Sequence, residues 1–443
     1  MNNNIDHDKL GLGSYFVANY PPFEFWPKAS ADRLDCRLNY SCESDLSLGI
    51  YVHIPFCRRR CEFCYFRVYT GKSSSDINAY LRGVIAELES YVELTYLSHR
   101  KPKFIYFGGG TPSYLSSDQI HELTDAMQQL MPWDAVEEIT FECEPGTLSE
   151  RKIATLRELG VTRLSLGVES FNDTILKANG RAHSIRHIYQ ALEWAHTADF
   201  PRINIDLIAG MVGETKETWL LTIQKTLELA PDSVTIYQLE VPSNTFLHRR
   251  LSESGSPVPA IVDWTTKRAW VAEARAMLIE AGYTTASAYT LVKNPGETDF
   301  LYRDSLWHGS DLIGLGVASF GHFGGMNAQN EKDIEIYLKR TLAGELPISR
   351  SYDLTADERL IRELVLQLKT GRVERAYFRQ KFGHDPAEKF AETLAELSGN
   401  GVLLVNQKEI IMSDHGLLIV DEMVRRFFLK SHRRCESFKT ANV

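Results

Sequence analysis

The sequence predicts an α/β fold, a partial (β/α)6-type barrel followed by a small helical, winged-helix-like domain. Short apolar runs recur at spacings of roughly 25–40 residues, which leaves room for a helix between strands. These runs are apolar almost throughout, as is typical of parallel strands that helices cover on both faces. Beyond about residue 350 the pattern changes to helices and one short hairpin. The pattern before about residue 350 therefore predicts the barrel, and the pattern after it predicts a separate small domain.

Capped helical segments separate the expected strands. Ser75-Asp76 and Ser117-Asp118 are expected to begin two helices, and Thr147 and Glu150 have the spacing of a capping box. Six or seven strand–helix units favour a partial or complete barrel over a flat doubly wound sheet. The order of the strands in the sheet cannot be read from the sequence. The expected strands are 48–54, 103–109, 137–144, 163–170, 202–210 and 232–240.

The chain divides into four predicted regions. Residues 1–45 are aromatic and proline-rich, and we expect a lid over the barrel mouth or a strap on its outside. Residues 46–290 form the barrel and residues 291–350 an extension of it. Residues 351–435 form the winged-helix-like domain, with helices in 356–371 and 387–401 and a hairpin in 402–413. The segment that would serve as recognition helix is acidic, which argues against DNA binding.

Composition narrows the class of protein. The 443 residues are 44% hydrophobic, and the net charge of −9 disfavours a nucleic-acid binder. No signal-peptide pattern and no run of about eighteen apolar residues is present, so we expect a cytoplasmic protein without a membrane span. We also expect a monomer with a small-molecule substrate. Four of the seven cysteines are scattered and are expected to be reduced thiols: Cys36, Cys42, Cys143 and Cys435.

The other three cysteines, Cys57, Cys61 and Cys64, lie in one loop after the first strand. A structural zinc site needs four ligands, and no second CxxC is present; His53 lies on the preceding strand. A cubane iron–sulfur cluster can be held at three corners, which leaves one iron open. The spacing favours a cluster, with zinc and ordinary thiols as the alternatives.

Other unusual residues fall at strand ends on the same side of the predicted sheet. GGGTP (108–112) ends the second strand, Glu142 and Glu144 end the third, and Glu169 ends the fourth. Ligands of parallel α/β folds bind at the carboxyl ends of the strands. Asp206 lies within the apolar fifth strand, where an unpaired carboxylate would be costly, so we expect a ligand or an arginine partner there.

The motifs together resemble a known family. CRRRCEFC (57–64) has the CxxxCxxC pattern of radical S-adenosylmethionine (SAM) enzymes. It is joined in order by YVHIPF (51–56), FGGGTPSYL (107–115), FECEPGTL (141–148), RLSLGVESF (163–171) and INIDLIAGM (203–211). From about residue 48 to 430 the chain resembles the oxygen-independent coproporphyrinogen III oxidase family, which also contains haem chaperones and methyl-transferring or cyclopropane-forming enzymes.

The resemblance implies cofactors and site residues. Cys57, Cys61 and Cys64 would hold a [4Fe–4S] cluster, whose electron cleaves SAM to a 5′-deoxyadenosyl radical. Positions that match the family's SAM contacts are Tyr51, Phe63, Gly109, Gly110, Glu142 and Phe320. Positions that match a second SAM are Gly110, Thr111, Glu169, Arg181 and Asp206. Glu169 departs from the family's glutamine, and a carboxylate cannot donate a hydrogen bond as an amide does.

The resemblance leaves three functional classes. Porphyrinogen oxidases of the family usually carry a fourth cysteine two positions after the last ligand, where this chain has Phe66. The chaperones carry an HNxxYW stretch, and residues 302–307 read YRDSLW, so only Trp307 is retained; His308 or His322 would have to substitute as haem ligand. These absences, and the retained second-SAM positions, favour methyl or methylene transfer to a specialised substrate. Porphyrin or haem chemistry and haem trafficking are the alternatives.

Three arginines, Arg58, Arg59 and Arg60, separate two of the cluster cysteines. We expect them to offset cluster charge, to dock an acidic electron donor such as flavodoxin or ferredoxin, or to point into solvent.

Overall fold

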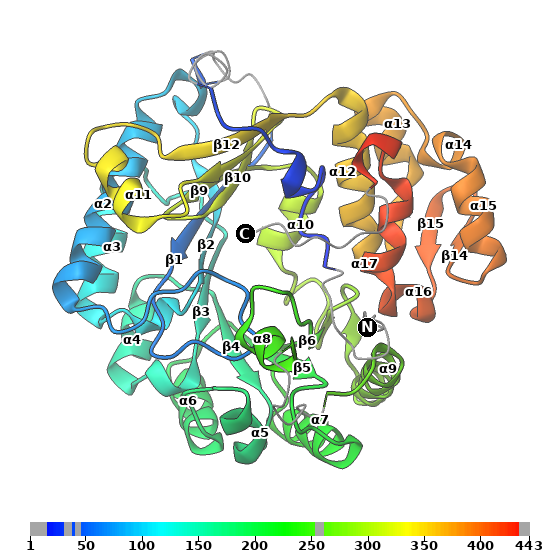
Figure 1. Cartoon of the computed structure of the whole chain (residues 1–443), viewed down its shortest axis with the longest axis horizontal. Helices are drawn as coiled ribbons and strands as arrows, with labels where there is room; N and C mark the ends of the chain where they lie inside the picture. The colour runs from blue at the N-terminus through cyan, green and yellow to red at the C-terminus, as the bar shows by residue number, and fades with distance from the viewer. Residues whose placement is uncertain (1–15, 31–37, 40–45, 253–260, 434–443) are drawn as a thin grey trace.

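The computed structural model describes residues 16–30, 38–39, 46–252 and 261–433 (Figure 1). The six strands that the sequence predicts are parallel, and in the structure they stand side by side in chain order. They are β1 (Leu48–Ile54), β2 (Pro102–Gly109), β3 (Glu138–Cys143), β4 (Arg163–Glu169), β5 (Arg202–Ala209) and β6 (Ser233–Gln238).

Further strands extend this sheet at both edges instead of closing it. Beyond β6 lie β8 (Thr290–Val292) and β7 (Thr284–Thr285), both antiparallel additions. Beyond β1 the order is β9 (Asp311–Leu315), which is parallel to β1, then β10 (Phe320–Phe323), β11 (Met326–Asn330) and β12 (Ile348–Asp353). The twelve strands form one open sheet, so the barrel is partial, as predicted.

Helices cover the outer face of the parallel strands (Figure 1). They are α2 (Ser74–Val92), α3 (Ser117–Leu130), α4 (Glu150–Glu158), α5 (Asp173–Ala178), α6 (Ile185–Thr197), α7 (Lys216–Leu229), α9 (Trp264–Glu280) and α11 (Ile334–Thr341). Two helices lie elsewhere: α8 (Phe246–Ser252) is tied by the N–H of Leu247 to the carbonyl of Glu62 in the loop after β1, and α10 (Leu301–Trp307) lines a cavity inside the sheet. Short 3-10 turns lie at Phe23–Phe25, Thr95–Leu97, Pro112–Tyr114 and Pro145–Thr147.

Three of the predicted helix starts are wrong by one or two residues. Ser73 and Ser116 are the N-caps of α2 and α3, each in a capping box completed by Asp76 and Gln119. Thr147 ends a 3-10 turn, and Ser149 caps α4 instead. Serine hydroxyls recur at these starts, so sequence alone leaves several residues that could accept the same backbone N–H groups.

The C-terminal part has its own small core and lies beside the barrel (Figure 1). After the hairpin the chain forms several short helical turns, and Ile419 leaves helical geometry between two of them. The elements are α12 (Ala356–Gln367), β13 (Arg372–Glu374), α13 (Arg375–Phe382), α14 (Pro386–Lys389), α15 (Ala391–Gly399), β14 (Leu403–Val405), β15 (Glu409–Met412), α16 (Asp414–Leu418) and α17 (Val420–Met423), with 3-10 turns at Leu368–Thr370, Val424–Phe427 and Lys430–His432.

The described part of the N-terminal region packs between the sheet extension and the C-terminal part. Tyr20 and Trp26 are buried, and the Tyr20 hydroxyl bonds Nδ1 of His432 at 2.9 Å. Arg350 of β12 donates to the carbonyl of Trp26 at 3.0 Å. Among the described helices, none has the length and apolar character that a membrane crossing requires.

Candidate functional site

The three clustered cysteines lie in the loop that follows β1. The Thr111 hydroxyl donates to Sγ of Cys57 at 3.3 Å, and Nη1 of Arg181 donates to Sγ of Cys61 at 3.2 Å. The backbone N–H of Cys64 donates to the carbonyl of Cys61 at 3.2 Å, which folds the loop back on itself. Burial raises the pKa of the Cys57 thiol to about 12, so metal binding there must displace a proton.

The glycine run brings bare backbone up to this loop. A side chain at Gly110 would meet Sγ of Cys57 at 3.0 Å, and the N–H of Gly110 donates to the carbonyl of Ile54 at 2.8 Å. Gly109 has a φ of +115°, which glycine adopts without strain, and its N–H donates to Oε2 of Glu142 at 3.0 Å. The backbone of these glycines therefore lies so close to Cys57 and Glu142 that larger side chains would not fit.

Glu142 is a partly buried acceptor near the end of β3. Besides Gly109, it accepts the Tyr106 hydroxyl at 2.6 Å. Burial raises its pKa to about 7, and the nearby Asp206 contributes in the same direction. Tyr51 stacks on Tyr106 with ring centroids 5.9 Å apart, and its hydroxyl bonds His53 at 3.1 Å. Tyr106 was not singled out by the sequence, although its position two residues before the glycines was available as a signal.

Arg181 joins the cysteine loop to the carboxylates of β4. Its Nη2 donates to the carbonyl of Gly167 at 2.8 Å and lies 3.5 Å from Oε1 of Glu169. Glu169 has a left-handed backbone, with φ of 65°, and burial raises its pKa to about 7 while Arg181 opposes that shift. Asp206 is held by Ser165 at 2.8 Å and Asn204 at 2.9 Å rather than by an arginine.

One cavity of about 570 Å³, which we call the central cavity, connects these groups. Its cysteine end includes Gly110, Thr111, Glu142, Glu169, Arg181 and Asp206. Its other end, the α10 end, includes Tyr106, Arg163, Phe300, Tyr302, Arg303 and Trp307. The carboxyl group of Glu138, the first residue of β3, accepts the N–H groups of Leu301 and Tyr302, both at 3.1 Å, so α10 begins at the amino ends of the strands.

The side walls of the central cavity come from segments that sequence reasoning did not connect with the site. They include Phe16, Tyr237, Tyr289 and the turns of residues 417–422. The N–H of Phe16 donates to Glu240, and Lys369 holds the carbonyl of Val17 and the carboxylate of Asp421, each at 2.6 Å. Phe16, which belongs to the segment predicted to form a lid or a strap, therefore lies at a cavity wall. Residues 1–15 of that segment lie outside the described residues.

Two predicted phenylalanines, Phe63 and Phe320, are placed differently from each other. Phe63 lines the central cavity near the cysteines. Phe320 is 39% exposed and packs edge to face on Phe23 and Trp26, each with centroids 5.7 Å apart, and it is not among the residues that line the cavity. Cys143 is a buried free thiol. Cys36, Cys42 and Cys435 lie outside the described residues.

The donor set at the cysteine end fits a cluster and SAM. Buried polar atoms without a partner gather at the central cavity, among them Arg181 Nε, Glu144 Oε1, Gln238 Oε1 and Arg303 Nη1. Within the described ranges, no three His, Cys, Asp or Glu side chains are arranged to hold a single metal ion. A cubane cluster takes one thiolate for each iron, so its ligands need not converge on one point.

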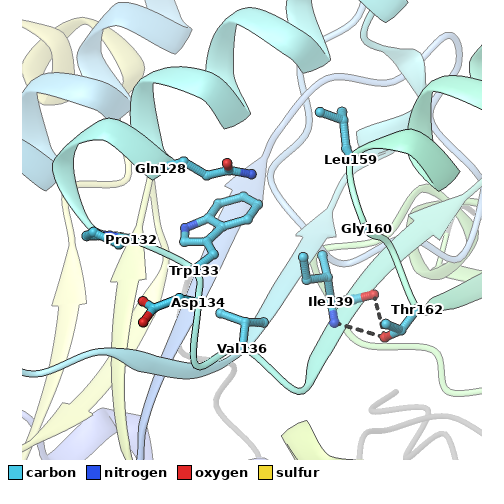
Figure 2. A pocket seen from close by; sticks show the side chains of 9 residues that line it. All are labelled: Gln128, Pro132, Trp133, Asp134, Val136, Ile139, Leu159, Gly160 and Thr162. Carbon is cyan, nitrogen blue, oxygen red and sulfur yellow. Dashed lines mark hydrogen bonds between the residues drawn. The ribbon is translucent and has the colours of Figure 1, made fainter.

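A second hollow of about 460 Å³ lies at the opposite ends of β3 and β4 (Figure 2). Trp133 forms one wall, and Gln128, Leu159 and Thr162 lie around it. Its one carboxylate, Asp134, is paired with Lys101 at 2.5 Å. This hollow lacks converging titratable groups, so the central cavity is the candidate active site.

The chain is similar to several known proteins over much of its length. The model of the radical SAM superfamily matches residues 51–226. The heme chaperone HemW of Lactococcus lactis is 29% identical over 384 residues, with 86% of this chain and 97% of the relative covered. The oxygen-independent coproporphyrinogen III oxidase of Escherichia coli is 26% identical over 415 residues, with 88% of each covered. The solved structure of coproporphyrinogen III oxidase (HemN) from Escherichia coli shares the fold, with a TM-score of 0.80, 24% identity and coverage of 93% of this chain and 96% of that one.

Residues 51–226 therefore match the radical SAM superfamily, and over most of its length the chain is similar to the coproporphyrinogen oxidase-like family. The cofactors that this similarity implies are a [4Fe–4S] cluster and SAM. The relatives support the porphyrin and haem-chaperone alternatives better than the methyl or methylene transfer that the sequence analysis favours, and they give no support to a methyltransferase.

Proposed function

We propose that this enzyme acts on a tetrapyrrole by chemistry of the coproporphyrinogen oxidase type. The observation that carries the proposal is the single central cavity, in which the positions that match SAM contacts face an aromatic and arginine-lined end. The rings of Tyr106 and Tyr302 pack at a tilt of 31° with centroids 4.4 Å apart, and the ring of Phe300 lies 5.8 Å from that of Tyr302. Aromatic faces of this kind suit a flat, apolar ring system.

With cluster and SAM bound, one electron cleaves SAM and supplies a 5′-deoxyadenosyl radical that abstracts hydrogen. Conversion of a substrate propionate to a vinyl group would release carbon dioxide, give one hydrogen atom to the 5′-deoxyadenosyl radical, which becomes 5′-deoxyadenosine, and give one electron to an oxidised one-electron carrier. In this reaction the chain's residues hold the participants in place. Glu142 accepts a ligand hydroxyl in its ionised form, Arg181 balances Glu169 beside Cys61, and the aromatic walls exclude water.

A haem-binding chaperone is the second candidate, because the match to two HemW relatives covers 85% and 86% of this chain and 98% and 97% of the relatives. Among the described residues no histidine lines the central cavity. His308 bonds the carbonyl of Asp304 at 2.7 Å and His322 bonds Asn327 at 2.7 Å, so neither is directed into it. Tyr302 occupies the position of the chaperones' histidine, and burial raises its pKa, which disfavours the phenolate form that binds haem iron.

The deciding experiment is anaerobic incubation of the reconstituted protein with dithionite and methyl-labelled SAM. Coproporphyrinogen III, haem and unrelated small molecules are offered in parallel. We expect 5′-deoxyadenosine and carbon dioxide with the porphyrinogen and no label in the product. Label in the product would favour methyl transfer instead. Tight haem binding without turnover would favour the chaperone.

We further propose that the electron donor is an acidic carrier protein that docks on the outer face of the cysteine loop. Arg58 and Arg59 are exposed there, and α8 presents Phe246 and Arg249 beside them. The N–H of Leu247 donates to the carbonyl of Glu62 at 2.9 Å, which ties α8 to the loop. This basic face stands out in a chain of net charge −9, and complementary charge speeds association.

The docking proposal predicts a donor-specific defect. Arg59→Glu with Arg249→Glu should slow SAM cleavage driven by flavodoxin or ferredoxin about tenfold and reverse its salt dependence, with dithionite-driven cleavage unchanged. Arg82→Glu, on the exposed face of α2, is the matched charge control. Equal loss with dithionite would contradict the proposal.

A further inference from the structure

The α10 end of the central cavity contains a guanidinium that is only partly paired. Arg303 is 9% exposed, and its Nε and Nη2 donate to Oδ1 of Asp304 at 2.8 and 2.7 Å. Its Nη1 is buried and has no hydrogen-bond partner. A buried charged donor without an acceptor is costly, so this position calls for an acceptor supplied from elsewhere.

The surroundings of Arg303 do not provide that acceptor. The rings of Trp307 and Phe300 lie 5.5 and 5.9 Å from its guanidinium carbon, and aromatic faces are weak acceptors. Arg163 is a second buried guanidinium at the same end; burial lowers its pKa, and the charge of Arg303 adds to that effect. Nη2 of Arg163 is engaged by Ser233 at 2.8 Å, whereas Nη1 of Arg303 remains available.

The ligand that completes this end is therefore an anion on a flat, apolar body. An anion beside Arg303 would relieve its repulsion with Arg163 and accept the Nη1 hydrogens. Carboxylate geometry matches a guanidinium edge. The neighbouring Tyr106 and Tyr302 rings leave an aromatic surface on which an apolar ring can lie. A ligand with both features spans the cavity from α10 toward the cysteine end.

We infer that Arg303 is the residue that recognises a peripheral carboxylate of the substrate and so sets the orientation of its ring in the cavity. This inference rests on the proposed tetrapyrrole function and adds the group that orients the ring. The sequence position supports a role particular to this chain, because Arg303 stands where the HNxxYW pattern of related chaperones has asparagine.

The test compares coproporphyrin III with its tetramethyl ester, which has the same ring and no ionised carboxylates. Binding is measured by fluorescence titration of the reconstituted protein under anaerobic conditions. Wild type should bind the free acid about tenfold more tightly than the ester. Arg303→Met should lose that preference and keep its affinity for the ester. Arg303→Lys should retain part of the preference, because lysine keeps the charge without the planar fork.

Two controls separate recognition from structural damage. SAM affinity and thermal unfolding of Arg303→Met should match wild type, and Arg268→Met, which alters another arginine of the cavity wall, should retain the preference for the acid. Equal wild-type affinity for acid and ester would overturn the inference and leave the tetrapyrrole proposal standing. Equal weakening of both ligands by Arg303→Met would also overturn it. Failure to bind any porphyrin would overturn the proposed function and this inference together.

Discussion

The two ends of the central cavity are built in different ways. The cysteine end consists of strand termini and glycine backbone, and its groups are fixed by short contacts such as Gly109 to Glu142 at 3.0 Å and Arg181 to Cys61 at 3.2 Å. The α10 end consists of aromatic and arginine side chains, with Tyr302 and Arg303 on one short helix. We infer that the first end performs the chemistry common to the superfamily and the second selects the substrate.

The largest effect should follow from removing a cysteine of the loop. Cys57→Ala, Cys61→Ala or Cys64→Ala should abolish 5′-deoxyadenosine formation, because a cubane held at two corners has lost a ligand. Iron content after anaerobic reconstitution should fall below the about four irons per chain expected for wild type. The measurement is iron analysis together with product chromatography.

The matched control for these variants is Cys143→Ala, which removes a buried free thiol on β3. It should keep wild-type iron content and measurable SAM cleavage. Full activity in any one of the three loop variants would contradict the proposed ligation.

A smaller, pH-dependent effect is expected at Glu142. Its pKa is raised from 4.5 to about 7 in the folded protein, so it is protonated below that pH and an acceptor above it. SAM affinity should therefore rise between about pH 6 and about pH 8, since the ionised form accepts ligand hydroxyl groups. Glu142→Gln should bind SAM about tenfold more weakly at the higher pH and lose this dependence. Equilibrium dialysis with the reconstituted protein measures both.

Glu144→Gln is the control for Glu142, since it neutralises the next carboxylate of the same strand end, which faces His183 at 3.8 Å. It should preserve the pH dependence. A wild-type affinity that does not change with pH would show that Glu142 does not contact SAM in its ionised form.

The comparison also explains which parts of the site sequence could predict. The cysteine end was predictable because its residues follow consecutive strands, whose carboxyl ends meet at one edge of a parallel sheet. The six strands fell within two residues of their expected bounds for the same reason. The spacing of Cys57, Cys61 and Cys64 is local and needs no tertiary information.

The α10 end was not predictable from spacing. The same holds for the side walls of the cavity, where Phe16, Tyr237, Tyr289 and residues 417–422 meet only because the described N-terminal segment and the C-terminal turns pack beside the sheet. Long-range packing of this kind leaves no periodic pattern in the chain. Arg303 carried one usable signal, its place in the altered HNxxYW stretch, but its free Nη1 could be seen only in the structure.

The smallest predicted effect separates substrate binding from SAM chemistry at the α10 end. Tyr302→Leu removes a ring that packs at a tilt against Tyr106 with centroids 4.4 Å apart, and aromatic pairs of this kind contribute about 0.5–1.5 kcal/mol. Porphyrin affinity should fall about two- to tenfold, while SAM affinity and SAM cleavage without substrate stay at wild-type values. Tyr302→Phe keeps the ring and removes a hydroxyl that makes no hydrogen bond to a described residue. This variant should therefore bind porphyrin normally. If Tyr302→Phe instead lost haem binding as completely as Tyr302→Leu, the hydroxyl would be acting as an iron ligand, and the chaperone function would replace the enzymatic one.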